Sequence, residues 1–188
     1  MEKRTSSDAD ASLDLGSSSL IVRPAEERDL KSILNIYNEG IEDRIATLES
    51  EPKEFSYMQD WFEAHRGRYA ALVAERDHQV VGWASLNPYS QRCAYDGVAD
   101  LSVYIARSAR GTGVGSRMLE ALERSARQND FRKIVLFTFP FNAAGQGLYR
   151  KAGYREVGIF EQQGILDGRP IDVMIMEKLL ANMVPENR

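Results

Sequence analysis

The stretch "SVYIARSARGTGVGSRML", residues 102–119, constrains the fold more than any other part of the chain. It begins with an apolar run typical of a strand and continues with a basic loop that holds three alternate glycines. In the segment that follows, apolar residues recur every four positions, as in an amphipathic helix: Val114, Met118, Leu122 and Ala126. The sequence therefore predicts a strand, a glycine-rich turn and a helix in direct succession.

A turn of this kind is suited to hold a pyrophosphate. Glycines let backbone N–H groups approach a phosphate closely, and the start of the helix adds its positive end. Arg107 and Arg110 bring positive charge to the same place. The alternative is a plain strand-to-helix turn with solvated arginines, and the loop by itself leaves both interpretations open.

Spacing excludes one familiar nucleotide-binding loop and disfavours a second. A P-loop needs a lysine directly after its last glycine, and Gly115 is followed by Ser116. A dinucleotide-binding fingerprint needs G-x-G-x-x-G, whereas Gly111, Gly113 and Gly115 are two residues apart, and no acidic residue closes the next strand.

The rest of the chain predicts one mixed α/β domain over residues 20–188. Residues 1–19 are rich in Ser, Asp and Ala without an apolar period, which predicts a disordered tail. Strands are expected at 20–25, 69–75, 80–86, 99–106, 133–139, 154–160 and 172–179, and helices at 26–41, 56–65, 113–130 and 142–153.

Composition excludes several classes of protein. The net charge of −4 disfavours a nucleic-acid binder. No run of about 18 apolar residues predicts a membrane span, and no apolar run follows Lys3 and Arg4, so a cytoplasmic location is expected. With one cysteine, Cys93, and two histidines, no metal site is predicted.

Two motifs in this order resemble those of the GNAT superfamily of acyl-CoA-dependent N-acyltransferases. "SVYIARSARGTGVGSRMLEAL" resembles motif A, Arg/Gln-x-x-Gly-x-Gly/Ala, through Arg110, Gly113 and Gly115, and "NAAGQGLYRKAGY" resembles motif B. The segments "IVRPAEERDL", "VAERDHQVVGWASLNPY" and "RCAYDGVADLSVYI" are similar to the phosphinothricin acetyltransferase branch, which includes methionine sulfone and methionine sulfoximine acetyltransferases. The resemblance spans roughly residues 20–180 and implies a mixed, mostly antiparallel central sheet flanked by helices.

The resemblance assigns an acetyl-CoA site to the first motif. The backbone of the strand would pair with the pantetheine arm, which involves Val103, Tyr104 and Ile105. The pyrophosphate would lie on the loop formed by Arg110, Gly111, Thr112, Gly113, Val114, Gly115 and Ser116. Asn142 would contact the arm and Lys151 would reach the phosphates, although Lys151 is equally well explained as a solvated helix lysine.

The chemistry requires a base, because an alkylammonium group must lose a proton before it attacks. By resemblance this base is Asp100, where the branch usually has Glu. The shorter Asp would need a bridging water and burial that raises its pKa. Tyr149 would protonate the departing CoA thiolate, or it is a core aromatic, and the N–H of Val103 would stabilise the oxyanion. Direct attack is favoured over a covalent relay through Cys93, which has no histidine nearby in the sequence.

The resemblance implies an acceptor pocket at the "SQRCAYD" loop, although Arg92 is equally well explained as a solvated loop arginine. Arg92 would pair with a carboxylate or phosphinate, Tyr95, Thr47 and Leu48 would form walls, and Asp100 and Ser102 would face the substrate. The function expected is acetylation of the α-amine of a small amino acid analogue by a homodimer. Acetylation of a protein N-terminus, a polyamine or an aminoglycoside, and a non-catalytic acyl-CoA-binding module, remain as alternatives.

Overall fold

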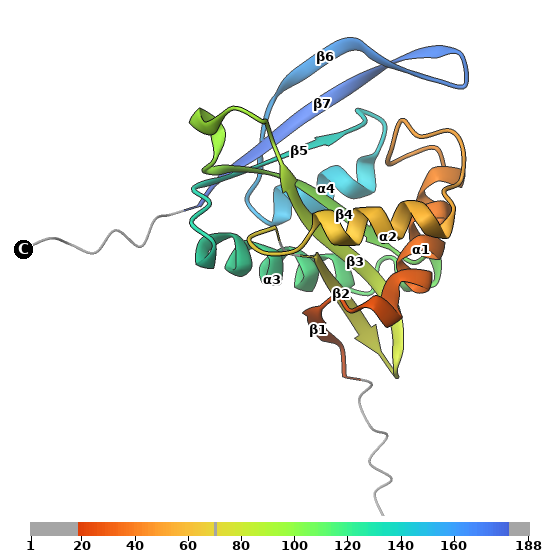
Figure 1. Cartoon of the computed structure of the whole chain (residues 1–188). Helices are drawn as coiled ribbons and strands as arrows, with labels where there is room; N and C mark the ends of the chain where they lie inside the picture. The colour runs from red at the N-terminus through yellow and green to blue at the C-terminus, as the bar shows by residue number, and fades with distance from the viewer. Residues whose placement is uncertain (1–18, 70, 181–188) are drawn as a thin grey trace, which may run out of the picture.

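The computed structural model describes residues 19–69 and 71–180, so almost all of the expected tail lies outside the described residues. Seven strands form one sheet in the order β1-β2-β3-β4-β5-β7-β6 (Figure 1). The strands are β1 (Ile21–Pro24), β2 (Ala71–Arg76), β3 (Gln79–Pro88), β4 (Val98–Ile105), β5 (Lys133–Thr138), β6 (Arg155–Leu166) and β7 (Arg169–Leu179). The β4–β5 pair is parallel and the other pairs are antiparallel. This confirms the mixed, mostly antiparallel sheet.

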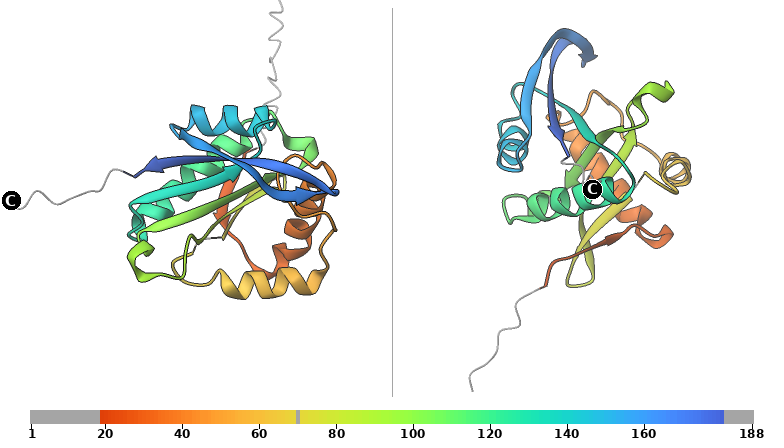
Figure 2. Two further views of the ribbon diagram at one scale, coloured as in Figure 1. Left: turned by 90° about the horizontal axis from the view of Figure 1, so that it is seen from above. Right: turned by 90° about the vertical axis from the view of Figure 1, so that its left-hand side faces the viewer.

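Four α-helices cover the two faces of the sheet (Figure 2). The helices α1 (Leu30–Glu42) and α2 (Phe55–Ala64) cover one face, and α3 (Val114–Gln128) and α4 (Ala143–Lys151) the other. Three 3-10 turns complete the order: η1 (Glu27–Asp29), η2 (Cys93–Tyr95) and η3 (Arg107–Ala109). Because β4 alternates its side chains between the faces, Tyr104 packs in the core under α1 and α2, whereas Leu101 packs in the core under α3.

The two central strands separate halfway along their length. β4 and β5 are paired from Val98 to Asp100, opposite Lys133 to Val135, and β4 then continues unpaired on that side to Ile105. Its other edge remains paired with β3 up to Ile105, opposite Gly82. The second half of β4 therefore presents a row of backbone groups to the gap between β4 and β5.

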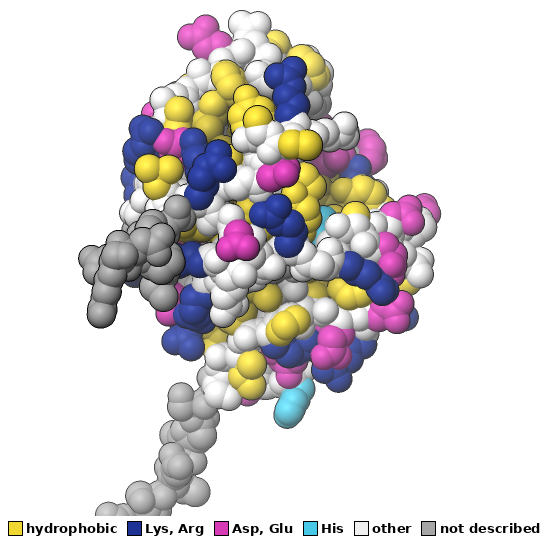
Figure 3. Space-filling model, turned by 60° about the vertical axis from the view of Figure 1, so that its left-hand side comes forward, with side chains coloured by type: hydrophobic (Ala, Val, Ile, Leu, Met, Phe, Trp, Pro, Cys, Tyr) yellow, Lys and Arg dark blue, Asp and Glu magenta, His cyan; other side chains and the backbone are white. Residues whose placement is uncertain are grey.

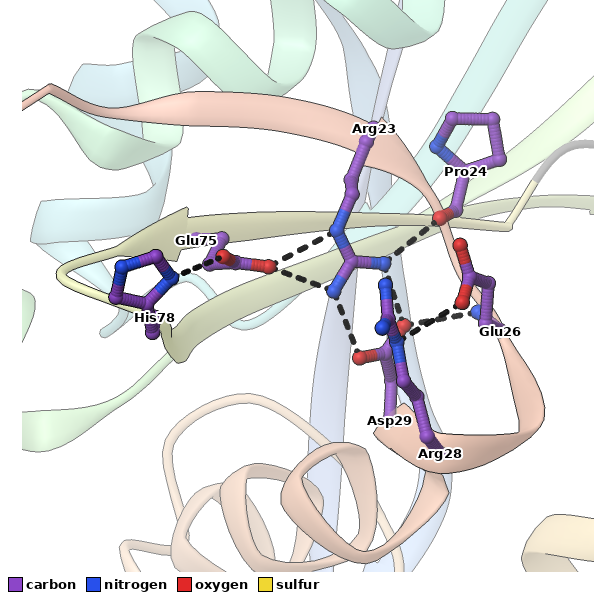
Figure 4. Close-up of polar contacts among 7 residues, drawn as sticks. All are labelled: Arg23, Pro24, Glu26, Arg28, Asp29, Glu75 and His78. Carbon is purple, nitrogen blue, oxygen red and sulfur yellow. Dashed lines mark hydrogen bonds and ion pairs between the residues drawn. The ribbon is translucent and has the colours of Figure 1, made fainter.

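A charged cluster fastens β1 to the rest of the domain (Figure 4). The guanidinium of Arg23 donates to both carboxylate oxygens of Asp29, at 2.7 and 2.9 Å, and to Glu75 of β2 at 2.7 Å. Burial pushes the pKa of Asp29 upward, but the hydrogen bonds from Arg23 and the backbone of Glu26 hold it below its ordinary value. The side chain of Arg23 thus joins three elements: β1, β2 and the turn that precedes α1.

Two elements differ from the sequence prediction. The helix expected to start at residue 26 begins as the turn η1, because Asp29 accepts from the backbone N–H of Glu26 and tightens the chain there. The last two strands are longer than expected, since β6 runs to Leu166 and β7 starts at Arg169. The polar segment 161–164 of β6 has no apolar alternation, because most of this edge strand is exposed.

On the face shown in Figure 3, basic and acidic side chains are interspersed among exposed hydrophobic ones. Among residues 19–69 and 71–180, no helix has the length and apolar character required to cross a membrane. In the same part of the chain, no group of three or more His, Cys, Asp or Glu side chains is arranged to hold a metal ion.

Candidate active site

A cavity of about 580 Å³ occupies the gap where β4 leaves β5. The glycine loop lies at one end of it, Asp100 at the other, and α4 along its side. It brings together most of the residues that the sequence predicted for the site: Asp100, Ser102, Val103, Tyr104, Ile105, Arg110, Gly111, Gly113, Gly115, Ser116, Asn142, Tyr149 and Lys151. The cavity thus joins predicted residues from Asp100 to Lys151, and its lining also includes Gly40, far earlier in the sequence.

The loop glycines have two different roles. Gly111 and Gly113 have positive φ angles of 76° and 85°, which L side chains rarely adopt, and no atom lies within 4 Å of where a Cβ would be. Gly113 is the N-cap of α3, so the first-turn N–H groups that follow lack partners within the helix. At Gly115 a Cβ would lie 2.8 Å from Leu148, which shows that this glycine lets α3 and α4 approach closely.

Two predicted loop residues do not line the cavity. The hydroxyl of Thr112 turns back to donate to the backbone carbonyl of Ala109, at 2.7 Å. The side chain of Val114 is 1% exposed and packs in the core beneath the loop. For both residues, a contribution to phosphate binding through the backbone remains a prediction.

An acidic residue at the end of α1 positions the loop arginine. Asp43 forms an ion pair with Arg110 at 2.6 Å, and Arg110 also donates from Nε to the carbonyl of Ile105 at 3.0 Å. Arg107 forms a second ion pair with Asp43 at 2.8 Å. Burial raises the pKa of Asp43, but hydrogen bonds from both guanidinium groups outweigh it and hold the pKa below its usual value. The loop therefore keeps one arginine at the cavity, while Lys151 lines it from the last turn of α4.

Asp100 lies at the point where β4 and β5 stop pairing. Burial raises the pKa of its carboxyl group to about 6, although hydrogen bonds from the backbone of Leu101 and from Asn87 act in the opposite direction. Its Oδ2 accepts from Asn87 at 3.4 Å, and its buried Oδ1 has no hydrogen-bond partner among the described residues. Asp100 thus has the raised pKa that a general base requires, together with one oxygen available to an incoming donor.

Tyr149 enters the cavity from α4 and is buried. Burial, with a smaller contribution from the charge of Asp100, raises the pKa of the phenol above its ordinary value. The side chain is therefore a neutral O–H group at neutral pH, as a proton donor must be.

A second, smaller cavity of about 160 Å³ lies on the other face of β4, beneath α1 and α2. It shares Ser102 and Tyr104 with the large cavity, and its lining carries no charged side chain: Tyr37, Tyr57, Met58, Trp61, Trp83, Asn87, Ser102 and Tyr104. Asn87 links the two sites, because its Nδ2 donates both to Ser102 at 3.0 Å and to Asp100. Sequence reasoning missed Asn87, which lies opposite Asp100 in the pairing of β3 with β4. The signal that could have found it is a polar residue at the end of an apolar strand.

The predicted acceptor residues of the loop after β3 lie outside both cavities. Arg92 is exposed and forms no ion pair among the described residues, and Tyr95 is 40% exposed and packs edge-on against Tyr89. Thr47 and Leu48 do not line the cavities either, since Leu48 packs with the core of Phe139 and Leu166. Their neighbours Ile45 and Ala46 do line the large cavity, so the α1–α2 connection contributes a wall through different residues.

Comparisons with known proteins identify the family of this chain. The acetyltransferase (GNAT) family pattern matches residues 30–154. An L-methionine sulfoximine/L-methionine sulfone acetyltransferase of Pseudomonas paraeruginosa is 33% identical over 158 residues, which cover 83% of this chain and 92% of that protein.

Two solved structures share the fold. A ribosomal-protein-alanine N-acetyltransferase from Brucella melitensis is 35% identical with a TM-score of 0.82, over 85% of this chain and 99% of that one. A phosphinothricin acetyltransferase from Sinorhizobium meliloti, solved in complex with acetyl-CoA, is 28% identical with a TM-score of 0.81, over 86% and 88% of the two chains. The chain belongs to the acetyltransferase (GNAT) family and is an N-acetyltransferase.

Proposed function

We propose that this enzyme acetylates the α-amine of a small amino acid analogue of the methionine sulfone, methionine sulfoximine or phosphinothricin type. The co-substrate is acetyl-CoA. The observation that carries the proposal is the position of Asp100, a carboxyl group with a pKa raised to about 6, at the closed end of the gap between β4 and β5. The names of the Pseudomonas and Sinorhizobium relatives support the substrate class.

The large cavity fits acetyl-CoA in three ways. The unpaired half of β4, from Leu101 to Ile105, offers N–H and C=O groups to the amide groups of the pantetheine arm. The first turn of α3 offers free N–H groups and its positive end to the pyrophosphate. Arg110 and Lys151 both line the cavity and supply positive charge.

The reaction proceeds by direct transfer in a ternary complex. Asp100 takes a proton from the ammonium group, directly or through a water, and the freed amine nitrogen attacks the thioester carbonyl carbon. The C–N bond forms, the C–S bond breaks, and Tyr149 gives its proton to the leaving thiolate. The attacking nitrogen loses its second surplus proton to solvent water, and the phenolate of Tyr149 takes a proton back from solvent. The N–H of Val103 is proposed to stabilise the oxyanion that forms during the attack. Cys93 is exposed, in the loop after β3, and takes no part.

The acceptor is proposed to lie between the two cavities, against Ser102 and Tyr104. The uncharged aromatic lining of the small cavity suits the neutral side chain of methionine sulfone better than a polyamine, which needs several carboxylates. Arg92 and Tyr95 remain proposed contacts of the substrate carboxylate, for which the exposed loop that carries them would have to fold toward the cavity.

The likeness to the ribosomal-protein-alanine N-acetyltransferase supports one second candidate, a protein N-terminus as acceptor. The two candidates are separated by measuring the release of free CoA thiol from acetyl-CoA against a panel. The panel contains methionine sulfone, methionine sulfoximine, phosphinothricin, ordinary amino acids, a polyamine, an aminoglycoside and a peptide with an N-terminal alanine.

We expect turnover with the methionine-like compounds at a kcat/KM at least a hundredfold above that of the peptide. Turnover confined to the peptide would replace the proposal with protein N-terminal acetylation. Tight binding of acetyl-CoA with no turnover on any member would favour a non-catalytic acyl-CoA-binding module.

We also propose that the enzyme is a homodimer and that it is located in the cytoplasm. Apolar side chains on the edge strand β6, among them Val157, Ile159 and Phe160, are each between 44% and 48% exposed and support an interface at this edge. Light scattering during size-exclusion chromatography is expected to give twice the mass of the chain, and a monomer at micromolar concentration would contradict the dimer.

A further inference from the structure

The small cavity lies on the same face of β4 as the side chain of Asp100. Side chains alternate along a strand, so Asp100, Ser102 and Tyr104 point to one face, and Ser102 and Tyr104 line the small cavity. Asn87 lines it as well and donates to Oδ2 of Asp100 at 3.4 Å. Neighbours on one face of a strand are about 6.8 Å apart, which is close to the reach of a methionine-type side chain from its α-amine. An acceptor whose amine lies at Asp100 can therefore extend its side chain along β4 into the small cavity.

The walls of the small cavity are aromatic rings that hold one another in place. Trp83 and Tyr104 stack with ring centroids 4.8 Å apart, and Tyr37 packs edge-on against Tyr104 at 5.0 Å. Trp61 packs against Trp83 at 5.2 Å, with the two ring planes at 70°. Rings packed in this way keep the shape of the cavity when a ligand enters, so little ordering is required on binding.

The polar groups of the lining are neutral and able to donate hydrogen bonds. They are the hydroxyls of Tyr37, Tyr57, Ser102 and Tyr104 and the amide of Asn87. Burial raises the pKa of Tyr37 and of Tyr104 above the ordinary value, so both phenols remain O–H groups. The indole N–H of Trp83 is buried and has no hydrogen-bond partner among the described residues. Neutral oxygen atoms that accept hydrogen bonds are the ligand groups that match this lining.

The charged groups near the small cavity lie behind its walls. Within the described part of the chain, no charged side chain lines the cavity. The ammonium group of Lys53 lies 5.3 Å from the centroid of the Tyr57 ring and forms an ion pair with Glu49. The carboxyl group of Asp100 meets the cavity through Asn87, and its ionised form opposes a second negative charge nearby.

We propose that the small cavity holds the side chain of the acceptor and selects a neutral sulfone or sulfoximine group over the anionic phosphinate of phosphinothricin. This inference rests on the proposed function and narrows its substrate class. A sulfone and a phosphinate have nearly the same shape, with a methyl group and two oxygen atoms on a tetrahedral centre. The phosphinate differs because it is ionised at neutral pH. A lining without a cation leaves that charge unpaired, and the loss of its hydration exceeds what neutral donors return.

Tryptophan fluorescence tests the occupant of the cavity without turnover. The two tryptophans of the chain, Trp61 and Trp83, both line the small cavity. Protein saturated with CoA, which has no acetyl group to transfer, is titrated with methionine sulfone, methionine sulfoximine, phosphinothricin and alanine. Because His65 lies behind Asn87, the titration is done at pH 8, where an imidazole of ordinary pKa is uncharged.

The sulfone and the sulfoximine are expected to give saturable changes in fluorescence, with Kd values at least a hundredfold below that of phosphinothricin. Alanine, which has the amino acid part but no head group, should give none. Equal Kd values for methionine sulfone and phosphinothricin, or no saturable change with the sulfone, would overturn the proposal.

A charge placed in the lining should reverse the selection. Tyr57 lines the cavity from α2 and is 39% exposed, so a lysine can be accommodated there, and Tyr57→Met is a neutral control of similar length. The kcat/KM for phosphinothricin, relative to that for methionine sulfone, is expected to be at least tenfold higher in Tyr57→Lys than in Tyr57→Met. Equal ratios in the two variants would show that the head group binds elsewhere and would overturn the proposal.

The two measurements separate this inference from the proposed function. Selective binding of the sulfone without turnover of any acceptor would remove the proposed function and retain the assignment of the cavity. Turnover of methionine sulfone and phosphinothricin by the wild type with equal kcat/KM would retain the proposed function and overturn the selection. The latter result is expected if the exposed Arg92, rather than the small cavity, receives the head group.

Discussion

At the scale of single residues, burial of Asp100 favours its proposed role as a base but lowers the stability of the fold at neutral pH. A carboxyl group with a folded-state pKa of about 6 and an ordinary value of 3.8 binds its proton more tightly in the folded protein than in the unfolded chain. Its contribution to stability is therefore full below pH 3.8 and is lost as the pH rises through 6. At neutral pH the ionised carboxylate destabilises the fold, and the proposed role as a base requires this cost.

Asp100→Asn is expected to abolish turnover and to stabilise the protein at pH 7.5. The gain in unfolding free energy should be about 2 kcal/mol, since each unit of pKa shift corresponds to about 1.4 kcal/mol. Residual burial of Asp100 in the unfolded chain makes the gain smaller than the full pKa shift would give. Urea denaturation at pH 7.5 and at pH 4 measures it, and the gain should vanish at pH 4. Destabilisation of equal size at both pH values would show that Asp100 is a structural carboxylate.

Arg92 is a predicted site residue that is exposed and lines neither cavity, so its loop would have to move for it to contact the substrate. If Arg92 pairs with the substrate carboxylate, Arg92→Ala raises the KM for methionine sulfone at least tenfold and leaves the KM for acetyl-CoA unchanged. Steady-state kinetics with each substrate varied in turn provide the measurement. An unchanged KM for the acceptor would remove the exposed loop arginine from the site.

The residues that sequence reasoning could find were those that belong to continuous motifs. The glycine loop, Asn142 and Tyr149 lie in two stretches whose local pattern is informative, and they line one cavity. Asn87 could not be found in this way, because its contact with Asp100 depends on the register between β3 and β4. A polar residue at the end of an apolar strand is a local signal, but that register is not encoded in any local pattern.

At the scale of elements, the glycine loop joins β4 to α3 in a conformation that few residues tolerate. Gly113→Ala places a side chain at a φ of 85°, which costs about 1 kcal/mol of stability. The new methyl group would also project into the space before the first turn of α3, so the Kd for CoA is expected to rise at least tenfold. Isothermal titration calorimetry measures that affinity.

Gly168→Ala is the matched control for this loop variant. Gly168, in the turn between β6 and β7, has a φ of 76° and no atom within 4 Å of a Cβ position, so the strain is similar. Its substitution should lower stability by a similar amount and leave the Kd for CoA unchanged. Equal Kd values for wild type and Gly113→Ala would contradict the assignment of the loop to the pyrophosphate.

Element types were predictable wherever one face of the element is buried. The helix after the glycine loop and the hairpin of β2 and β3 agree closely with their apolar periods. The long edge strand β6 was predicted only as far as residue 160, because residues 161–164 are polar or glycine and show no apolar alternation. Two irregularities in its pairing with β7 weaken the pattern further.

At the scale of the whole molecule, the site exists because two neighbouring strands separate. The pairing of β4 with β5 ends at Asp100, and the gap beyond it brings together an unpaired strand edge, a carboxyl group with a raised pKa and the start of a helix. The sequence predicted a mixed sheet, but the order of its strands depends on pairings between distant segments that no local pattern reveals. The separation of β4 from β5 likewise depends on where the pairing of these two strands ends.

The central claim is that this cavity transfers an acetyl group from acetyl-CoA to an amino acid α-amine with Asp100 as base. The most direct measurement is mass spectrometry of a reaction of the full chain with acetyl-CoA and methionine sulfone, run beside Asp100→Asn. The wild type should yield N-acetylmethionine sulfone in equal amount to free CoA, at a rate at least a hundredfold above that of Asp100→Asn. Release of CoA without an acetylated amine, or equal rates for the two proteins, would contradict the account.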